Sequence, residues 1–307
     1  MYYLQNMIRK IIKQGHNTLT VTLPAEWVRG KGLKGGDEID LSIIDGEILV
    51  SAENKDTIKK AEIDVKKPNR LISRSIFNLY RKGVDEIKIN YDDPIIIRDI
   101  YGYMPLLMGF EITEQGKNYS IIKNVMKINP DEFNSTMRRY FLITKSLADE
   151  TYLALKENRF DEMEGLIELE SVQNRLYMYL CRVIHKNSIV KNPTLLFLLI
   201  QRLEDIADDY KYICQYVTDL DGQIKISKPV LDMIKDTNKV FDLVHHFYYK
   251  FDNNTGKEII ESKKKIIKNG LKLLETVNKK EIRIAHIING TIVKIYEASS
   301  PIFGMSV

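Results

Sequence analysis

The spacing of apolar residues changes along this chain, and that change constrains its fold more than any other feature. Residues 18–23 alternate apolar and hydroxyl side chains with a period of two, which is typical of a half-buried strand. Residues 38–43 alternate in the same way, directly after the turn signal of residues 35–37. From residue 130 onward, apolar residues recur every three or four positions, as on the buried face of a helix. A strand-rich beginning and a long helical remainder are therefore expected.

The 307 residues are too many for one typical domain, and the pattern predicts three segments. Residues 1–54 predict strands, glycine turns and a short helix. Residues 55–129 have a mixed pattern that predicts a small α/β unit, with a spacer or an interface as its role. Residues 130–307 predict two three-helix repeats, over 130–217 and 228–307. The expected fold class is multidomain α+β.

Individual elements follow from the same periodicity. In the first segment, a helix is expected over 25–28, and Asp45-Gly46 predicts a hairpin turn into a strand over 47–50. The middle segment predicts, in order, a helix over 71–80, a strand over 86–90, a helix over 94–107, and strands over 110–113 and 119–122. The helices expected in the last segment are 131–157, 160–186, 194–217, 229–250, 255–276 and 279–299. The clearest apolar seam has alternating spacings of four and three, and consists of Leu199, Leu203, Ile206, Tyr210, Ile213 and Val217.

Composition predicts a soluble, cytoplasmic protein without membrane insertion. The apolar fraction of 44% and the charged fraction of 29% are ordinary for a globular protein. The longest apolar run, Leu195 to Ile200, is far shorter than the ~20 residues that span a bilayer. The N-terminus lacks the apolar stretch of a signal peptide. Cys181 and Cys214 have no metal-type spacing, so free buried thiols are expected.

Charge is unevenly distributed along the chain. The net charge of +4 arises from 46 basic and 42 acidic residues, which by itself does not indicate nucleic-acid binding. Through Gly35, however, several basic residues accompany a single acid, Glu26, and the next stretch is acidic. This segregation predicts one positive face suited to phosphate contact, and an ordinary solvated strand surface is the alternative. The basic residues are Arg9, Lys10, Lys13, Arg29, Lys31 and Lys34, and the acidic ones Asp37, Glu38, Asp40, Asp45, Glu47 and Glu53.

The first segment resembles the AbrB/SpoVT, or looped-hinge, DNA-binding family. Leu23-Pro24 ends a strand before a short helix, and Gly36-Asp37 opens the next strand, as in that family's pattern. The resemblance implies a swapped-hairpin β-barrel made by two chains, and a segment this small cannot close a core alone. It also implies DNA contacts from the basic residues just named, although that family often has arginine where Trp27 or Val28 stands. A module that only dimerises is the alternative.

The helical segment resembles the PhoU family, which carries acidic pairs on two three-helix bundles. Residues 202–208 resemble that family's E-x-I-A-D type motif, and residues 170–177 resemble its acidic "DxEVDRLY" segment. Residues 283–286 resemble a second copy of the first motif. Glu204 and Asp208, four residues apart, share one helix face, and their carboxylates suit Mg²⁺, Mn²⁺ or ferric iron.

The metal motifs depart from the family pattern in both halves. In the first half, Glu170, Asn174, Glu204 and Asp208 make up one candidate metal site, with Asn174 in place of an aspartate. In the second half, Ile282 and His286 replace the acidic pair, and lysines occupy residues 263–265. No metal is therefore certain, and a solvated acidic helix surface is the alternative to a site for a divalent or ferric ion.

The order of the three segments resembles the archaeal phosphate-uptake regulators, whose middle segments are similar to residues 80–87 and 107–112. This resemblance implies a homodimeric, DNA-binding transcriptional regulator of phosphate homeostasis, in which the helical part senses or relays phosphate status. The alternative is an adaptor without DNA binding that regulates a phosphate-transporter ATPase or another phosphate-signalling protein. No nucleophile elbow, P-loop, His-Glu-x-x-His or dinucleotide fingerprint occurs in the sequence, so an enzyme is not expected.

Overall fold

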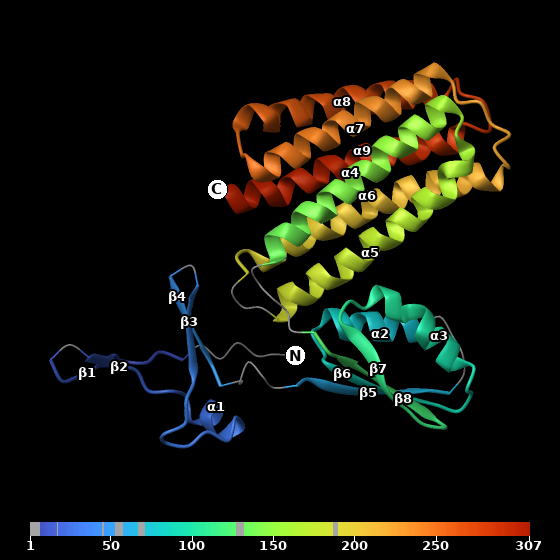
Figure 1. Cartoon of the computed structure of the whole chain (residues 1–307). Helices are drawn as coiled ribbons and strands as arrows, with labels where there is room; N and C mark the ends of the chain where they lie inside the picture. Colours follow the sequence, from blue (N-terminus) through green and yellow to red (C-terminus); the bar gives the residue numbers. More distant parts are fainter. Residues whose placement is uncertain are drawn as a thin grey trace. The chain divides into compact units, whose positions relative to one another are not determined.

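The computed structural model describes residues 7–16, 18–44, 46–52, 58–66, 71–126, 132–186 and 190–307. The chain divides into two compact units, Met1–Thr57 and Ile58–Val307 (Figure 1). The predicted middle and helical segments therefore lie together in one unit. The predicted boundaries at 54/55 and 129/130, and the acidic residues Asp45 and Glu53, lie outside the described residues.

The first unit contains two separate hairpins and a short helix. β1 (Ile12–Gln14) pairs antiparallel with β2 (Thr18–Thr20). β3 (Asp40–Ile44) pairs antiparallel with β4 (Glu47–Ser51). Between the hairpins, α1 (Ala25–Gly30) begins directly after proline, as predicted.

Many large apolar residues of the first unit are exposed, and others, such as Leu23 and Trp27, are half-buried. None of its described residues is buried. Leu41, Ile43 and Ile48 lie on one face of the second hairpin and are 64%, 80% and 68% exposed. One copy of this unit therefore has no hydrophobic core of its own.

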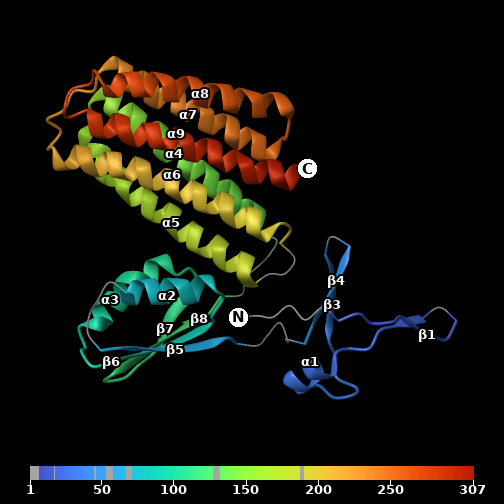
Figure 2. The same ribbon diagram turned by 180° about the vertical axis from the view of Figure 1, so that it is seen from behind.

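The second unit begins with a four-stranded sheet in the order β5-β6-β8-β7. β5 and β6 are parallel, while β8 is antiparallel to both of its neighbours, β6 and β7. The strands are β5 (Lys60–Val65), β6 (Glu86–Tyr91), β7 (Phe110–Gln115) and β8 (Tyr119–Asn124). Helices α2 (Leu71–Arg81) and α3 (Ile96–Tyr103) cover one face of this sheet (Figure 2), and a 3-10 turn at Met104–Leu106 follows α3. The predicted elements are confirmed, whereas β5 was not predicted.

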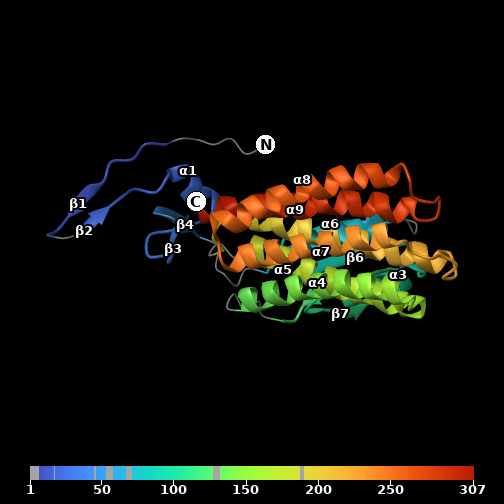
Figure 3. The same ribbon diagram turned by 90° about the horizontal axis from the view of Figure 1, so that it is seen from above.

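Six long helices form the rest of the second unit (Figure 3). They are α4 (Phe133–Glu157), α5 (Met163–Lys186), α6 (Pro193–Asp219), α7 (Lys228–Tyr249), α8 (Asn253–Leu274) and α9 (Ile282–Ser306). Each lies close to its predicted range, and the six residues of the predicted seam on α6 are fully buried. α6 packs against α9 and α4 against α7, so the first three and the last three of these helices share one core. In contrast to the prediction, α9 continues through Pro301 to Ser306.

A buried arginine joins the end of α5 to the α/β part of this unit. The guanidinium of Arg182 donates hydrogen bonds to the carbonyl oxygens of Tyr80 and Val84, at 2.9 and 2.6 Å. It also donates to the carboxylate of Asp85 at 2.6 Å, and the Arg182 side chain is only 1% exposed. Burial lowers the pKa of Arg182, and the charge of Asp85 opposes that shift. The hydrogen bonds and the carboxylate together compensate a desolvated cation.

Gly83, two residues after the end of α2, lies at this interface. It has a φ of +78°, which glycine adopts without steric cost. A Cβ atom at this position would lie 2.5 Å from Cγ of Lys186, whose ammonium pairs with Asp85. The same residue therefore ends the helix and allows α5 to approach.

We expect Asp85→Ala to lower the free energy of unfolding by about 3–5 kcal/mol, because it leaves the Arg182 guanidinium buried without its carboxylate. Urea unfolding followed by circular dichroism measures this loss. Asp232→Ala is the matched control, since it removes an exposed partner of Lys228 and is expected to leave the midpoint unchanged. A loss for Asp85→Ala no larger than for the control would contradict a compensating role of this carboxylate.

Candidate nucleic-acid interface and bundle polar network

Three of the predicted DNA contacts lie at the first hairpin. Arg9 and Lys10 precede β1, and Lys13 lies within it, opposite Leu19 of β2. All three side chains are exposed. The hairpin projects away from α1 (Figure 1), so the charges it carries are accessible to a large partner.

The other three lie on and after α1. Arg29 is in the last turn of α1, where a cation is favourable for the helix dipole, and Lys31 caps that helix. Lys34 follows in a turn that is held by a hydrogen bond from its backbone nitrogen to the Asp37 carboxylate, at 2.7 Å. These side chains are exposed as well. The structure thus places the six predicted contacts in two groups within one copy of the unit.

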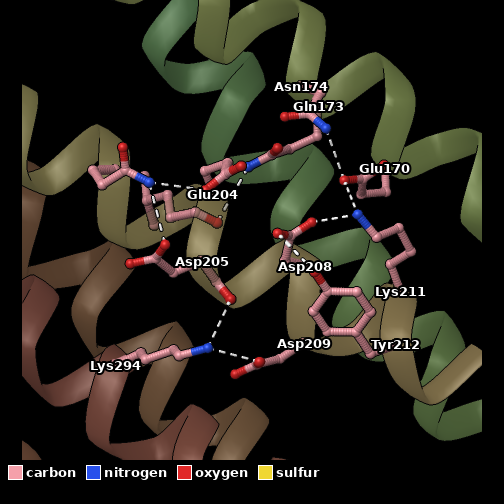
Figure 4. A network of polar contacts seen from close by, with 12 residues as sticks. Glu170, Gln173, Asn174, Glu204, Asp205, Asp208, Asp209, Lys211, Tyr212 and Lys294 are labelled. Atoms are coloured by element: carbon pink, nitrogen blue, oxygen red, sulfur yellow. Dashed lines mark hydrogen bonds and ion pairs between the residues drawn. The ribbon is translucent and has the colours of Figure 1, made fainter. Parts of the chain in front are cut away.

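The predicted metal ligands Glu170 and Asp208 face each other across α5 and α6, with a lysine between them (Figure 4). Nζ of Lys211 donates to the Glu170 carboxylate at 2.8 Å and also to Asp208. Asn174 donates to the same Glu170 oxygen at 2.8 Å. Burial opposes the charge of Lys211, but its hydrogen bonds to the two carboxylates raise its pKa. Lys211 therefore supplies the positive charge that the metal hypothesis assigns to a bound cation.

Glu204, the fourth predicted ligand, contacts a different partner. Its carboxylate accepts a hydrogen bond from the side-chain amide of Gln201 at 2.9 Å. Burial, followed by the charges of three neighbouring carboxylates, raises the pKa of Glu204 to about 7. Within the described ranges, no group of three or more His, Cys, Asp or Glu side chains has the geometry to hold a metal ion.

A chain of hydrogen bonds runs from Glu204 to the α/β part, and no sequence pattern predicted it. Gln201 on α6 accepts from the hydroxyl of Tyr177 on α5, at 2.7 Å. That hydroxyl accepts from the guanidinium of Arg81 on α2, at 2.8 Å. The chain therefore crosses three helices and ends beside the sheet.

Two ion pairs connect α6 to α9. Asp209, which is buried, accepts from Lys294 at 2.7 Å and from the hydroxyl of Thr291 at 2.9 Å. Arg202 on α6 pairs with Glu297 on α9 at 3.1 Å. The acidic run of α6 thus also fastens the two helical repeats to each other.

Both cysteines are free and buried, as predicted. Burial raises the pKa of Cys181 to about 12 and that of Cys214 to about 11. Thiols with so little thiolate are poor nucleophiles and metal ligands at neutral pH.

Residues 12–58 match the family described as "Antidote-toxin recognition MazE, bacterial antitoxin". The match spans both hairpins and α1, and it supports the prediction of an AbrB-like first unit. No curated protein and no solved structure matches the chain. No comparison supports the PhoU-like interpretation of the helices, which stays a prediction. Among the described residues, no helix has the length and apolar character to cross a membrane.

We expect Glu204→Gln to stabilise the protein at high pH and to have little effect at low pH. The folded state binds the Glu204 proton more tightly than the unfolded state, whose carboxyl has an ordinary pKa of 4.5. The wild type therefore loses stability as pH rises from 4.5 to about 7, and the cost is fully present above that range. Allowing for solvent screening of this partly exposed group, the variant gains about 1–2 kcal/mol at high pH.

Urea unfolding of both proteins at about pH 5 and about pH 8 measures the difference. Asp232→Asn, which neutralises an exposed carboxylate on α7, serves as the control. An equal stability difference at the two pH values would show that the Glu204 pKa is not raised.

Proposed function

We propose that this protein is a homodimeric DNA-binding regulator in which the first units of two chains complete each other. The observation that carries the proposal is that no described residue is buried in a unit that matches an antitoxin family. Exposed Leu41, Ile43 and Ile48 need a partner surface, and a second copy of the same hairpins provides a self-complementary one. The swapped-hairpin barrel expected from the AbrB resemblance is the arrangement we assign to this dimer.

DNA contact is proposed for the exposed basic residues of the paired first units. Lysine and arginine carry their charge at the end of a flexible side chain, which suits contacts with phosphate oxygens. Such contacts release the counterions condensed on the DNA. Dimerisation doubles the number of basic residues, and it brings together groups that are separated within one copy. Because these contacts carry little sequence information, base readout is assigned to other residues of the paired hairpins.

The helical part is proposed to receive the signal, and phosphate status is the signal that its resemblance to PhoU proteins implies. The hydrogen-bonded chain from Glu204 to Arg81 supports a connection between the acidic network and the α/β part. A divalent or ferric ion at Glu204 and Asp208 would have to displace the Lys211 ammonium, or bind beside it. We assign no catalytic role and a cytoplasmic location to the protein.

A protein-binding regulator is the second candidate. The description of the matched family names recognition of a toxin. This favours a first unit that binds a protein instead of DNA. The corresponding sequence-based alternative is an adaptor for a phosphate-transporter ATPase or another phosphate-signalling protein. DNA affinity and its salt dependence distinguish the two candidates.

We expect the wild type to bind duplexes from its own promoter and from phosphate-transporter promoters, with an affinity that falls steeply with salt. Fluorescence anisotropy across a salt series measures this dependence. In the variant Arg9→Ala/Lys10→Ala/Lys13→Ala, binding weakens and the salt slope falls by about 0.9 for each lost phosphate contact. The control Lys156→Ala/Lys225→Ala/Lys235→Ala removes the same charge from exposed positions of the helical bundle. An intact wild-type dimer that binds no DNA at low salt would overturn the DNA-binding proposal and favour the second candidate.

We expect Leu41→Asp/Ile43→Asp to separate the dimer into monomers at micromolar concentration, because charged residues cannot be buried between paired hairpins without partners. Sedimentation velocity measures the mass of the species, and circular dichroism shows whether the helical bundle stays folded. Leu142→Asp, at an exposed position of α4, is the control. A wild type that sediments as a monomer, or a variant that stays dimeric, would refute hairpin-mediated dimerisation.

A further inference from the structure

Positive charge is concentrated in one segment of the helical bundle. Residues 250–283, which include α8 and its flanking turns, contain ten basic and five acidic residues, a net charge of +5. The whole chain has a net charge of only +4, so the remaining residues together carry −1. This segment is separate from the basic stretch of the first unit, and the proposed function does not use it.

Two of the five acids in this segment have structural roles. The carboxylate of Asp252 caps α8 by accepting from the backbone nitrogens of Asn254 and Thr255, at 3.0 and 2.9 Å. Glu281 is 2% exposed and accepts from the backbone nitrogen of Ser227 at 2.5 Å. Neither acid is available to neutralise lysines on the outer surface of α8, which itself carries six lysines against Glu258 and Glu261.

The lysines of α8 form a row. At about 100° and 1.5 Å per residue, Lys257, Lys264, Lys268 and Lys272 lie within an arc of roughly 80° and span about 22 Å. All four are exposed, and none forms an ion pair with another residue of the described ranges. Other lysines of the bundle, Lys228 and Lys239 among them, do pair with nearby carboxylates. Glu261 lies in the same arc but forms no ion pair with these lysines in the described ranges, so the row carries a net positive charge.

The position of α8 leaves this row accessible. α8 packs against α7 and α9 at the edge of the bundle (Figures 1 and 3). Its buried residues, Ile259, Ile266 and Gly270, lie on the opposite side of the helix from the lysines. No other described element covers the row closely enough to pair with its charges.

The chemistry of the row favours the phosphate backbone of DNA. Lysine is a point charge on a flexible stem, which suits repeated phosphate contacts, whereas base readout favours arginine and amide side chains. A membrane-binding helix places apolar residues along the centre of its exposed face. On α8 the lysines occupy the centre, and exposed Ile260 and Leu271 lie along one edge.

We propose that Lys257, Lys264, Lys268 and Lys272 of α8 form a second, sequence-independent contact with DNA, outside the site bound by the first units. The inference rests on the proposed function, which brings DNA to the protein. In a dimer, two such rows contact the phosphates that flank the site. They add affinity and salt dependence without adding sequence selectivity.

The test compares two duplexes that share one binding site, one of about two helical turns and one extended by about two turns on each side. Full-length wild type is compared with Lys257→Gln/Lys264→Gln/Lys268→Gln/Lys272→Gln. The control is Lys156→Gln/Lys191→Gln/Lys225→Gln/Lys235→Gln, which removes the same charge from other exposed positions of this unit. Anisotropy across a salt series gives affinity and slope for each pair, and circular dichroism verifies folding.

We expect the wild type and the control to bind the long duplex at least about tenfold more tightly than the short one, with a steeper salt slope. The α8 variant keeps its affinity for the short duplex and loses the gain on the long one. Equal gains for all three proteins would overturn the α8 contact while leaving DNA binding by the first units intact.

Two further arms separate this inference from the proposed function. If Arg9→Ala/Lys10→Ala/Lys13→Ala still binds the long duplex and the α8 variant does not, the α8 contact stands and the proposed role of the first units fails. Vesicles of phosphatidylglycerol and phosphatidylcholine test the lipid alternative. Vesicle binding that depends on the α8 lysines, with unchanged affinity for long DNA, would overturn the assignment to DNA.

Discussion

The buried ion pair between Arg182 and Asp85 is the interaction on which the arrangement of the second unit depends. A desolvated guanidinium is costly unless carbonyls and a carboxylate surround it, and the loop after α2 provides both. The last turns of α5 are therefore fixed against α2 and the loop that follows it. This places Tyr177, about one turn earlier on α5, within hydrogen-bonding distance of Arg81. The polar chain that reaches Gln201 and Glu204 exists because the interface already holds α5 in place.

The acidic residues of α6 differ in whether a basic side chain pairs with them. The Asp208 carboxylate has Lys211 as a partner, and Asp209 has Lys294. Glu204 forms no ion pair among the described residues, and burial, followed by the charges of neighbouring carboxylates, raises its pKa. Glu204 is therefore the carboxylate of this network with the least opposing positive charge nearby, and a cation that enters the network is attracted most strongly there. Glu204 is also the end of the hydrogen-bonded chain that leads to the α/β part, which is why we assign signal reception to this side of the bundle.

Periodicity along the sequence predicted the six long helices, because one buried face imposes a regular spacing on each of them. It did not predict β5, where only Ile63 and Val65 are large apolar residues. It ended α9 too early, because Pro301 removes a local hydrogen bond that burial of the helix outweighs. The candidate ligands were located, but the role of Lys211 was missed, since a motif of acids at one spacing contains no information about a lysine that bridges two helices. Arg182 pairs with a residue 97 positions away, and local patterns cannot show such a contact.

The first unit has no buried residue among those described, and on the proposed function a second chain completes its core. The first hairpin, with its adjoining segment, carries Arg9, Lys10 and Lys13, while the second hairpin exposes Leu41, Ile43 and Ile48. If two chains pair through these hairpins as proposed, folding of this unit, dimerisation and DNA binding are linked equilibria, because DNA that binds only the paired form stabilises it by mass action. The second unit has a large core within one chain and does not share this dependence. On that proposal, a signal that changes how the two helical parts are held acts on DNA affinity through the pairing of the first units, without contacting DNA itself.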